Sequence, residues 1–258
     1  MVEKDKTQIP KVIHYCWFGG NPLPKSALKF ISTWRKFFPD YEIKEWNENN
    51  FDINIIPYVR EAYDARKYAF VSDYARFWIL YHYGGLYFDV DVKVIADFQE
   101  IIARGPFMGR EFTYKESEKL GELGVNPGLV LASYPHHHFY KEVLDFYSGL
   151  HFVNKEGEKV PYTVVEHVSG LLQKYGLKNK EGIQEVAGIN IYPADYFSPK
   201  SSLDLKLRLT KNSRSIHYFA ASWKPPKRRK IWVMGKKYPR TMRMLVIIKH
   251  LLDGTRPI

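Results

Sequence analysis

Residues 11–94 alternate between short β-branched or aromatic runs and segments with helical periodicity. Strands are predicted at 11–18, 41–46 and 86–94, and helices at 24–38 and 58–83, the second with a break near Ser72. Gly19-Gly20 and Gly84-Gly85 separate these segments. Strands that alternate with helices indicate an α/β fold, and we expect a mixed, mostly parallel central sheet flanked by helices.

The pattern is weaker after about residue 105. A strand is predicted at 128–132, helices at 138–149 and 164–175, and a late strand at 215–219. The chain has 258 residues and a hydrophobic fraction of 45%, which suffices for one domain with its own core and excludes a disordered chain.

Two absences bear on the compartment. The single cysteine, Cys16, excludes an internal disulfide framework and a zinc site built from cysteines. Neither a signal peptide nor an apolar run of about 18 residues is found. We therefore expect a cytoplasmic protein, either soluble or peripheral at the inner face of the cell membrane.

The formal net charge of +11 is concentrated at the C-terminal end. Residues 224–258 hold eleven Lys and Arg against one acid, Asp253, which leaves residues 1–223 nearly neutral. We expect a globular domain at 1–223 and a basic amphipathic extension at 224–258, with a helix at 240–252. The extension suits an anionic membrane surface, while a solvated charged face and a helix packed on the domain are the alternatives. No signature of a nucleic-acid-binding motif is found, so nucleic acid is not an expected partner.

Asp89 and Asp91 carry the clearest chemical signal. Residues two apart in a strand point to the same side, and two carboxylates beside an apolar run require a positive charge between them. Mg²⁺ or Mn²⁺ bound to a diphosphate would supply that charge. Because a bare D-x-D is common, a surface strand with two solvated carboxylates is the alternative.

Asp73 and Arg76 precede this pair in a helix that is otherwise apolar. Their spacing of three residues places them on one helix face. An exposed ion pair of little consequence is the ordinary interpretation of such a spacing. The apolar surroundings favour a paired or functional role instead.

The whole block, S-D-x-x-R-x-x-x-L-x-x-x-G-G-x-Y-x-D-x-D, resembles the DXD-type sugar-transferase region of glycosyltransferase family 32. Residues 9–20, with Trp17 and Gly19-Gly20, resemble the first strand of that family, and residues 217–223 resemble its late motif. The family is similar to yeast initiating mannosyltransferases and, more distantly, to glucosylating clostridial toxins. The resemblance implies a GT-A fold, a Rossmann-like domain that binds a nucleotide sugar at the C-terminal ends of its strands.

The resemblance also implies roles for single residues. Trp17 would stack on the base, and Gly19 and Gly20 would let the backbone approach the nucleotide. Asp73 and Arg76 would hold the sugar and diphosphate, and with Asp91 they form the expected catalytic set. The remaining expected donor-binding residues are Tyr87, Asp89, Asn126, Ser222 and Trp223.

The same resemblance implies one Mn²⁺ or Mg²⁺ ion. Asp91 and His217 would bind it directly, and Asp89 directly or through a water molecule. The tract at 136–138 is not expected to form a metal site, because three adjacent histidines cannot all face one ion.

The implied activity is that of a retaining, metal-dependent glycosyltransferase in cell-surface polysaccharide or oligosaccharide synthesis. It would move a hexose or N-acetylhexosamine from a nucleotide sugar to a glycan acceptor, a lipid-linked one included. A UDP-linked donor is favoured because the Trp17 motif resembles UDP-using relatives, and GDP-mannose is the alternative. A catalytically inactive nucleotide-sugar or membrane-binding protein and a metal-dependent phosphoester hydrolase are the competing functions.

Overall fold

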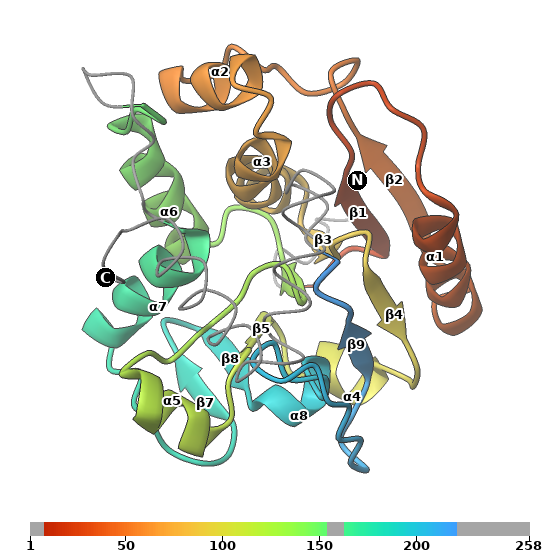
Figure 1. Ribbon diagram of the computed structural model, residues 1–258, viewed down its shortest axis with the longest axis vertical. Helices are drawn as coiled ribbons and strands as arrows, with labels where there is room; N and C mark the ends of the chain where they lie inside the picture. Colours follow the sequence, from red (N-terminus) through yellow and green to blue (C-terminus); the bar gives the residue numbers. More distant parts are fainter. Residues whose placement is uncertain (1–7, 154–162, 221–258) are drawn as a thin grey trace, which may run out of the picture.

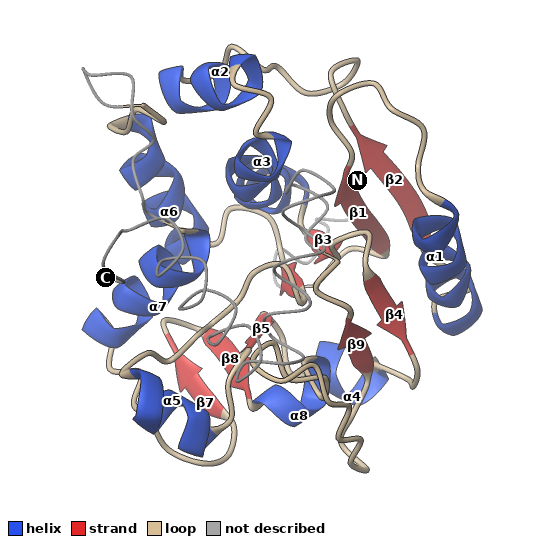
Figure 2. Ribbon diagram, in the orientation of Figure 1, coloured by secondary structure: helices blue, strands red, loops and turns tan. Residues whose placement is uncertain are grey.

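A computed structural model describes residues 8–153 and 163–220 (Figure 1). Strands and helices alternate through most of this part of the chain (Figure 2). The strands are β1 (Val12–Cys16), β2 (Glu42–Trp46), β3 (Gly85–Tyr87), β4 (Val92–Val94), β5 (Phe107–Gly109), β6 (Leu131–Ser133), β7 (Gln184–Val186), β8 (Ile189–Tyr192) and β9 (Ser215–His217). The helices are α1 (Lys25–Phe37), α2 (Pro57–Asp64), α3 (Tyr68–Tyr83), α4 (Gln99–Ile102), α5 (Tyr114–Leu120), α6 (His138–Ser148), α7 (Val164–Lys174) and α8 (Ala194–Phe197).

Seven strands form the central sheet in the order β2-β1-β3-β6-β5-β8-β7. β1 pairs in parallel with both β2 and β3, and β5 pairs in parallel with β8. β6 and β7 run against their neighbours, so the other five strands share one direction. The predicted class, a mixed and mostly parallel sheet flanked by helices, is therefore confirmed.

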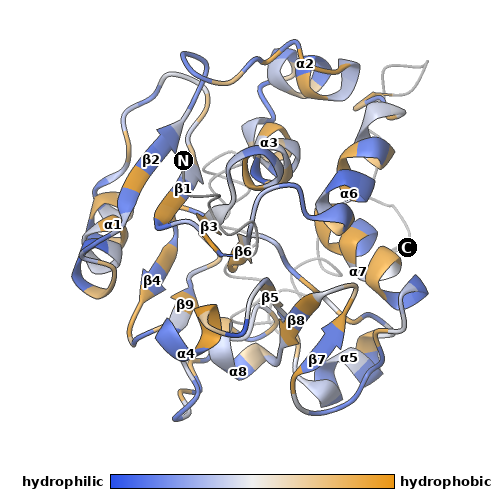
Figure 3. Cartoon of the chain, turned by 180° about the vertical axis from the view of Figure 1, so that it is seen from behind, coloured by the Kyte–Doolittle hydropathy of each residue, from blue (hydrophilic) through white to orange (hydrophobic). Residues whose placement is uncertain are grey.

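The two faces of the sheet bury two separate apolar clusters. One cluster packs α2, α3, α6 and α7 against side chains such as Cys16 and Met108. The other packs α1, α4, α8 and β4 against side chains such as Ile13 and Phe107. The two layers are visible when the chain is seen from behind (Figure 3). Alternation of side chains along each strand supplies both faces.

The segment predicted as one strand at 86–94 divides into β3 and β4. β3 lies in the central sheet, whereas β4 pairs with β9 in a separate two-stranded sheet. Between them the chain turns, and Val92 N–H donates to the Asp89 carbonyl over 3.0 Å. The expectation that Asp89 and Asp91 share one face of a continuous strand is therefore wrong, and a turn brings them together instead.

The predicted helix at 58–83 breaks at a different place from that expected. It divides into α2 and α3 at residues 65–67, where Arg66 has a φ of 55°. Ser72 lies inside α3 and its hydroxyl donates to the Tyr68 carbonyl over 3.1 Å, so it caps no helix. The chain leaves α3 through Gly84, with a φ of 64°, where a Cβ would lie 2.9 Å from the Ser133 carbonyl oxygen. This tight exit directs β3 into the sheet.

The later predictions agree closely at α6, α7 and β9, whereas the strand expected at 128–132 corresponds to β6, which begins three residues later and ends one residue later. In the part of the chain that the structure describes, no helix is both long and apolar enough to cross a bilayer. The extension at 224–258, with its predicted helix at 240–252, lies outside the described residues, so the division at residue 223 stays a prediction.

Candidate active site

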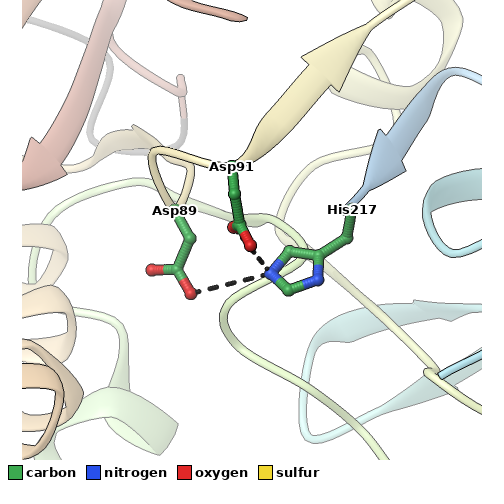
Figure 4. Close-up of side chains that lie close together, drawn as sticks. All are labelled: Asp89, Asp91 and His217. Atoms are coloured by element: carbon green, nitrogen blue, oxygen red, sulfur yellow. Dashed lines mark ion pairs between the residues drawn. The ribbon is translucent and has the colours of Figure 1, made fainter. Parts of the chain in front are cut away.

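The pairing of β4 with β9 brings together three side chains that could share one ion. The antiparallel register sets Val92 opposite His217. Asp89 and Asp91 lie in the turn before β4, so both carboxylates face the imidazole (Figure 4). One potential ligand atom from each of the three side chains lies within 4.8 Å of the others.

Asp91 is held on both sides of its carboxylate. Oδ1 lies 3.0 Å from His217 Nε2, and Oδ2 accepts a hydrogen bond of 2.8 Å from the Ala220 N–H. Burial opposes the charged form, but the positive charge on His217 and these hydrogen bonds outweigh it, and the pKa of Asp91 is lowered. Asp91 therefore presents an ionised and oriented carboxylate.

His217 is buried between the two carboxylates. Burial acts to lower its pKa, yet Asp91 at 3.0 Å and Asp89 at 3.9 Å raise the pKa of His217 to about 10. The proton on the imidazole then supplies the positive charge that the two acids require. A divalent cation would supply the same compensation, with the imidazole as a neutral ligand.

Asp89 connects the ion site to the interior of the sheet. Its Oδ1 accepts from the Tyr87 hydroxyl over 3.0 Å and lies 3.3 Å from Arg76 Nη2. Its Oδ2 occupies space that a Cβ at position 128 would enter to within 2.4 Å, so Gly128 leaves room for this carboxylate. The Asp89 side chain is 30% exposed, which keeps it open to a ligand.

Arg76 lies under the site and is only 4% exposed. Its Nη2 is 3.0 Å from Asp73 Oδ1, and its guanidinium lies 5.0 Å from the centre of the Tyr87 ring. Burial opposes the charge on Arg76, but Asp89, Tyr87 and Asp73 outweigh it and raise its pKa. The predicted pairing of Asp73 with Arg76 is therefore present, and it is a buried pair rather than an exposed one.

Two tyrosines near Asp73 carried no signal in the sequence. Tyr58 from α2 and Tyr147 from α6 pack edge to face at 5.0 Å between ring centroids. Burial raises the pKa of each phenol, and the negative charge of Asp73 raises it further. Both rings therefore lie close enough to Asp73 for its charge to act on their phenol groups.

Trp17 lies in the loop that follows β1, and the side chain of Glu48 contacts this loop. Its indole is half-buried, and Nε1 donates to the Asn21 carbonyl over 2.6 Å. Glu48 accepts a hydrogen bond from the Gly19 N–H and another, of 3.0 Å, from the Tyr63 hydroxyl. Gly19 has a φ of 97° and lies against the Tyr68 ring, so a side chain there would be strained and obstructed. Glu48 could not be selected from the sequence, because its contact with Gly19 joins residues 29 apart.

Asn126 lies beside the ion site. Its Nδ2 donates to Glu111 over 2.7 Å, and its Oδ1 accepts from the Gly128 N–H over 2.8 Å. A Cβ at Gly128 would meet this Oδ1 at 3.1 Å as well as the Asp89 carboxylate. Asn126 is thus placed next to Asp89, whereas the other late members of the expected set, Ser222 and Trp223, lie outside the described residues.

Lys200 is a further cation near the site. Its Nζ donates to the Tyr218 carbonyl over 3.3 Å and lies 4.7 Å from the centre of the Tyr218 ring. Burial lowers the pKa of Lys200, and the charge of Asp91 acts against that shift. In the histidine tract, the imidazole of His137 accepts from the Phe139 N–H at the start of α6.

Among the solved structures, one similar to this chain is titled PaToxG Glycosyltransferase. It is 19% identical, with a TM-score of 0.49, over 64% of this chain and 68% of that chain.

Two curated relatives come from Schizosaccharomyces pombe. Inositol phosphoceramide mannosyltransferase 3 is 34% identical over 88 residues, which are 33% of this chain and 24% of that protein. Inositol phosphoceramide mannosyltransferase 2 is 24% identical over 219 residues, which are 83% of this chain and 58% of that protein. The chain therefore spans less than two thirds of the length of either relative.

The family model that matches is the glycosyltransferase sugar-binding region containing the DXD motif, and the match covers residues 24–108. This range includes both acids of the turn as well as Asp73 and Arg76. It confirms the resemblance drawn from the sequence for the block that contains the DXD motif. Residues 24–108 are therefore similar to the sugar-binding region of glycosyltransferases that contain the DXD motif.

Proposed function

We propose that the protein is a retaining, metal-dependent glycosyltransferase with a GT-A fold, which moves a hexose or N-acetylhexosamine from a nucleotide sugar to a glycan acceptor. The observation that carries the proposal is the cluster of Asp89, Asp91 and His217, with the buried Arg76 beside it. Such a cluster combines an ion site with a fixed positive charge, and a leaving diphosphate needs both.

The donor set fits Mn²⁺ or Mg²⁺. Two carboxylates are the oxygen ligands that these ions prefer, and one imidazole is compatible with Mn²⁺. The raised pKa of His217 reflects a place where a positive charge is favoured. Asp91 and His217 would hold the ion directly, and Asp89 directly or through water. When bound, the ion would stabilise the charge that develops on the leaving diphosphate.

The remaining side chains would bind and orient the donor. Arg76 would face the phosphate and glycosidic oxygens from below, and Asp73 would accept hydrogen bonds from sugar hydroxyls. Tyr87 fixes the Asp89 carboxylate, and Asn126 lies next to it. In this proposal no carboxylate is the covalent nucleophile: the acceptor hydroxyl attacks the face that the diphosphate leaves, and the departing phosphate takes its proton.

The base would stack on Trp17, in the loop that Glu48 supports. The resemblance of this motif to UDP-using proteins favours a UDP-sugar. The names of the two relatives, both mannosyltransferases, favour GDP-mannose as the second candidate. We place the enzyme in the cytoplasm, peripheral at the inner face of the membrane through residues 224–258, acting in cell-surface glycan synthesis on an acceptor that is free or lipid-linked.

Calorimetric titration with UDP and GDP, each with and without Mn²⁺, tests the proposal. We expect one nucleotide to bind in a Mn²⁺-dependent manner, and Asp91→Ala to weaken that binding on the order of 100-fold. Asp64→Ala is the matched control, because Asp64 is an exposed acid that pairs with Arg60 on α2. If neither nucleotide binds with any metal, the transferase assignment fails.

A further inference from the structure

The loop between α8 and β9 exposes three leucines within seven residues. Leu203, Leu207 and Leu209 are 38%, 51% and 56% exposed. We name residues 203–211 the leucine loop. In Figure 1 the end of the segment between α8 and β9 extends below α4, while the Thr210 hydroxyl donates to Asp195 of α8 over 2.9 Å. Leucines exposed together in this way usually mark a surface that binds a partner.

Cations alternate with these leucines. Lys206, Arg208 and Lys211 are exposed, and the single acid of the leucine loop, Asp204, is paired with Arg208. Neither lysine forms an ion pair with any residue in the described ranges. The outer surface of the loop therefore combines apolar side chains with uncompensated positive charge.

The base of the loop is buried and closed by hydrogen bonds. The Ser201 N–H donates to the Lys206 carbonyl over 3.0 Å, and the Arg208 N–H donates to the Pro199 carbonyl over 2.8 Å. Ser202 is only 1% exposed. The leucines are thus presented by an ordered loop, which needs no folding on contact.

The loop also leads directly to the ion site. At its near end, Lys200 donates to the Tyr218 carbonyl, and the Tyr218 N–H donates to the Asp91 carbonyl over 3.0 Å. At its far end, the chain enters β9, which carries His217. The segments on both sides of the leucine loop therefore contain residues that contact or form the ion site.

We propose that the leucine loop docks on an anionic lipid bilayer, with its leucines in the interface and its lysines against the headgroups. Apolar side chains flanked by cations have the chemistry of such a surface. The extension at 224–258 is a poor candidate to cover the loop, because it carries a net charge of +10 and the loop is also positive. The site is distinct from that extension and does not depend on the transferase activity.

A fluorescent label on the loop tests this directly. Because Cys16 is the only cysteine and is buried, Leu207→Cys creates one accessible thiol for a polarity-sensitive dye. With vesicles of phosphatidylcholine and 30% phosphatidylserine, we expect the emission of this dye to shift to the blue. Leu28→Cys is the matched control, because Leu28 is 53% exposed on α1 and is expected to give no shift.

Vesicle flotation of the full chain gives the second readout. We expect Leu207→Ser with Leu209→Ser to weaken binding about tenfold or more, and Lys206→Ala with Lys211→Ala to weaken it about fivefold for each cation, with unfolding midpoints unchanged. Flotation of both double variants with the affinity of the parent would assign membrane binding to another surface and overturn the proposal. Two other results would also overturn it. One is a parent chain that does not bind the vesicles, and the other is a dimer, detected by light scattering, that dissociates in the variant with Leu207→Ser and Leu209→Ser.

Discussion

Arg76 and Arg110 are buried to nearly the same depth, at 4% and 3% exposure, but in opposite surroundings. Arg76 lies between the carboxylates of Asp73 and Asp89. Arg110 forms no ion pair with any described residue. Its guanidinium donates instead to neutral oxygens: the carbonyls of Leu123 and Lys180 and the side chains of Ser117 and Asn179.

The two surroundings have opposite effects on the pKa of the arginine. Burial acts against the charge of both, but the carboxylates raise the pKa of Arg76, whereas the pKa of Arg110 is lowered. Arg110 therefore ties segments together by satisfying acceptors. Arg76 belongs to an assembly of charges whose arrangement would change when a charged ligand arrives.

The largest expected effect is the loss of activity in Arg76→Lys. Lysine keeps the charge but cannot reach Asp73 and Asp89 with one planar group, nor reproduce the donation from Nε to the Ser72 carbonyl. We expect turnover of the donor sugar to fall by about 10²-fold or more, as on removal of a preorganised donor. Steady-state kinetics with the nucleotide sugar found by calorimetry measures this.

Arg76→Gln goes further, because it leaves two acids without their buried cation. We expect a loss of about 3–5 kcal/mol in the free energy of unfolding, which urea titration would detect. An Arg76→Lys enzyme with normal turnover would remove Arg76 from the catalytic machinery and leave it a structural residue like Arg110.

The second prediction is that substitution of Arg110 lowers stability without lowering activity. Arg110→Met removes donors to four acceptors, and we expect the free energy of unfolding to fall by about 2–4 kcal/mol. Nucleotide affinity and turnover of the folded fraction should stay within about twofold of the parent. Activity normalised to folded protein, measured well below the unfolding midpoint, would reveal a direct role for Arg110 if it dropped as far as in Arg76→Lys.

Much of the fold could be predicted because local pattern and structure agree. The alternation before residue 84, α6, α7 and β9 follow from periodicity and from Gly-Gly breaks. The division of residues 86–94 could not be predicted, since a β-branched run reads as one strand and only the distant β9 draws β4 out of the sheet. The break at Arg66 had no glycine or proline to mark it, and β5, β7 and β8 are short strands that depend on their neighbours.

The residues of the candidate site also divide into those that could be predicted from the sequence and those that could not. Asp89, Asp91, Arg76 and His217 could be predicted because their motifs resemble a known family, and the structure brings them together. Glu48, Gly128 and Lys200 could not, because each acts through a contact between distant segments. The buried state of Arg76 was also not readable from its spacing to Asp73 alone.

The rule that separates the arginines also separates two buried histidines. His217 faces carboxylates, which raise its pKa to about 10. His14 faces none: its Nδ1 accepts from Trp46 Nε1 over 3.0 Å and its Nε2 contacts the Gly84 carbonyl at 3.0 Å. Burial lowers the pKa of His14 to about 4. The neutral tautomer satisfies both neighbours, whereas a second ring proton would oppose the indole N–H.

The smallest expected effect is therefore a pH dependence of stability. The pKa of His14 is lower in the folded protein, so the unfolded chain takes up the proton first. The stability from neutral His14 is present in full above the ordinary pKa of about 6.5 and is lost as the pH falls toward 4. At pH 5 the loss is about 2 kcal/mol relative to pH 7.

Urea unfolding at pH 7 and pH 5 measures this loss, and His14→Gln isolates it, since glutamine can accept from Trp46 without titrating. We expect the variant to lose about 2 kcal/mol less than the parent between the two pH values. An equal loss of stability in the parent and in His14→Gln would show that burial without a carboxylate does not keep His14 neutral. The distinction drawn between buried groups with and without a carboxylate neighbour would then fail for histidine.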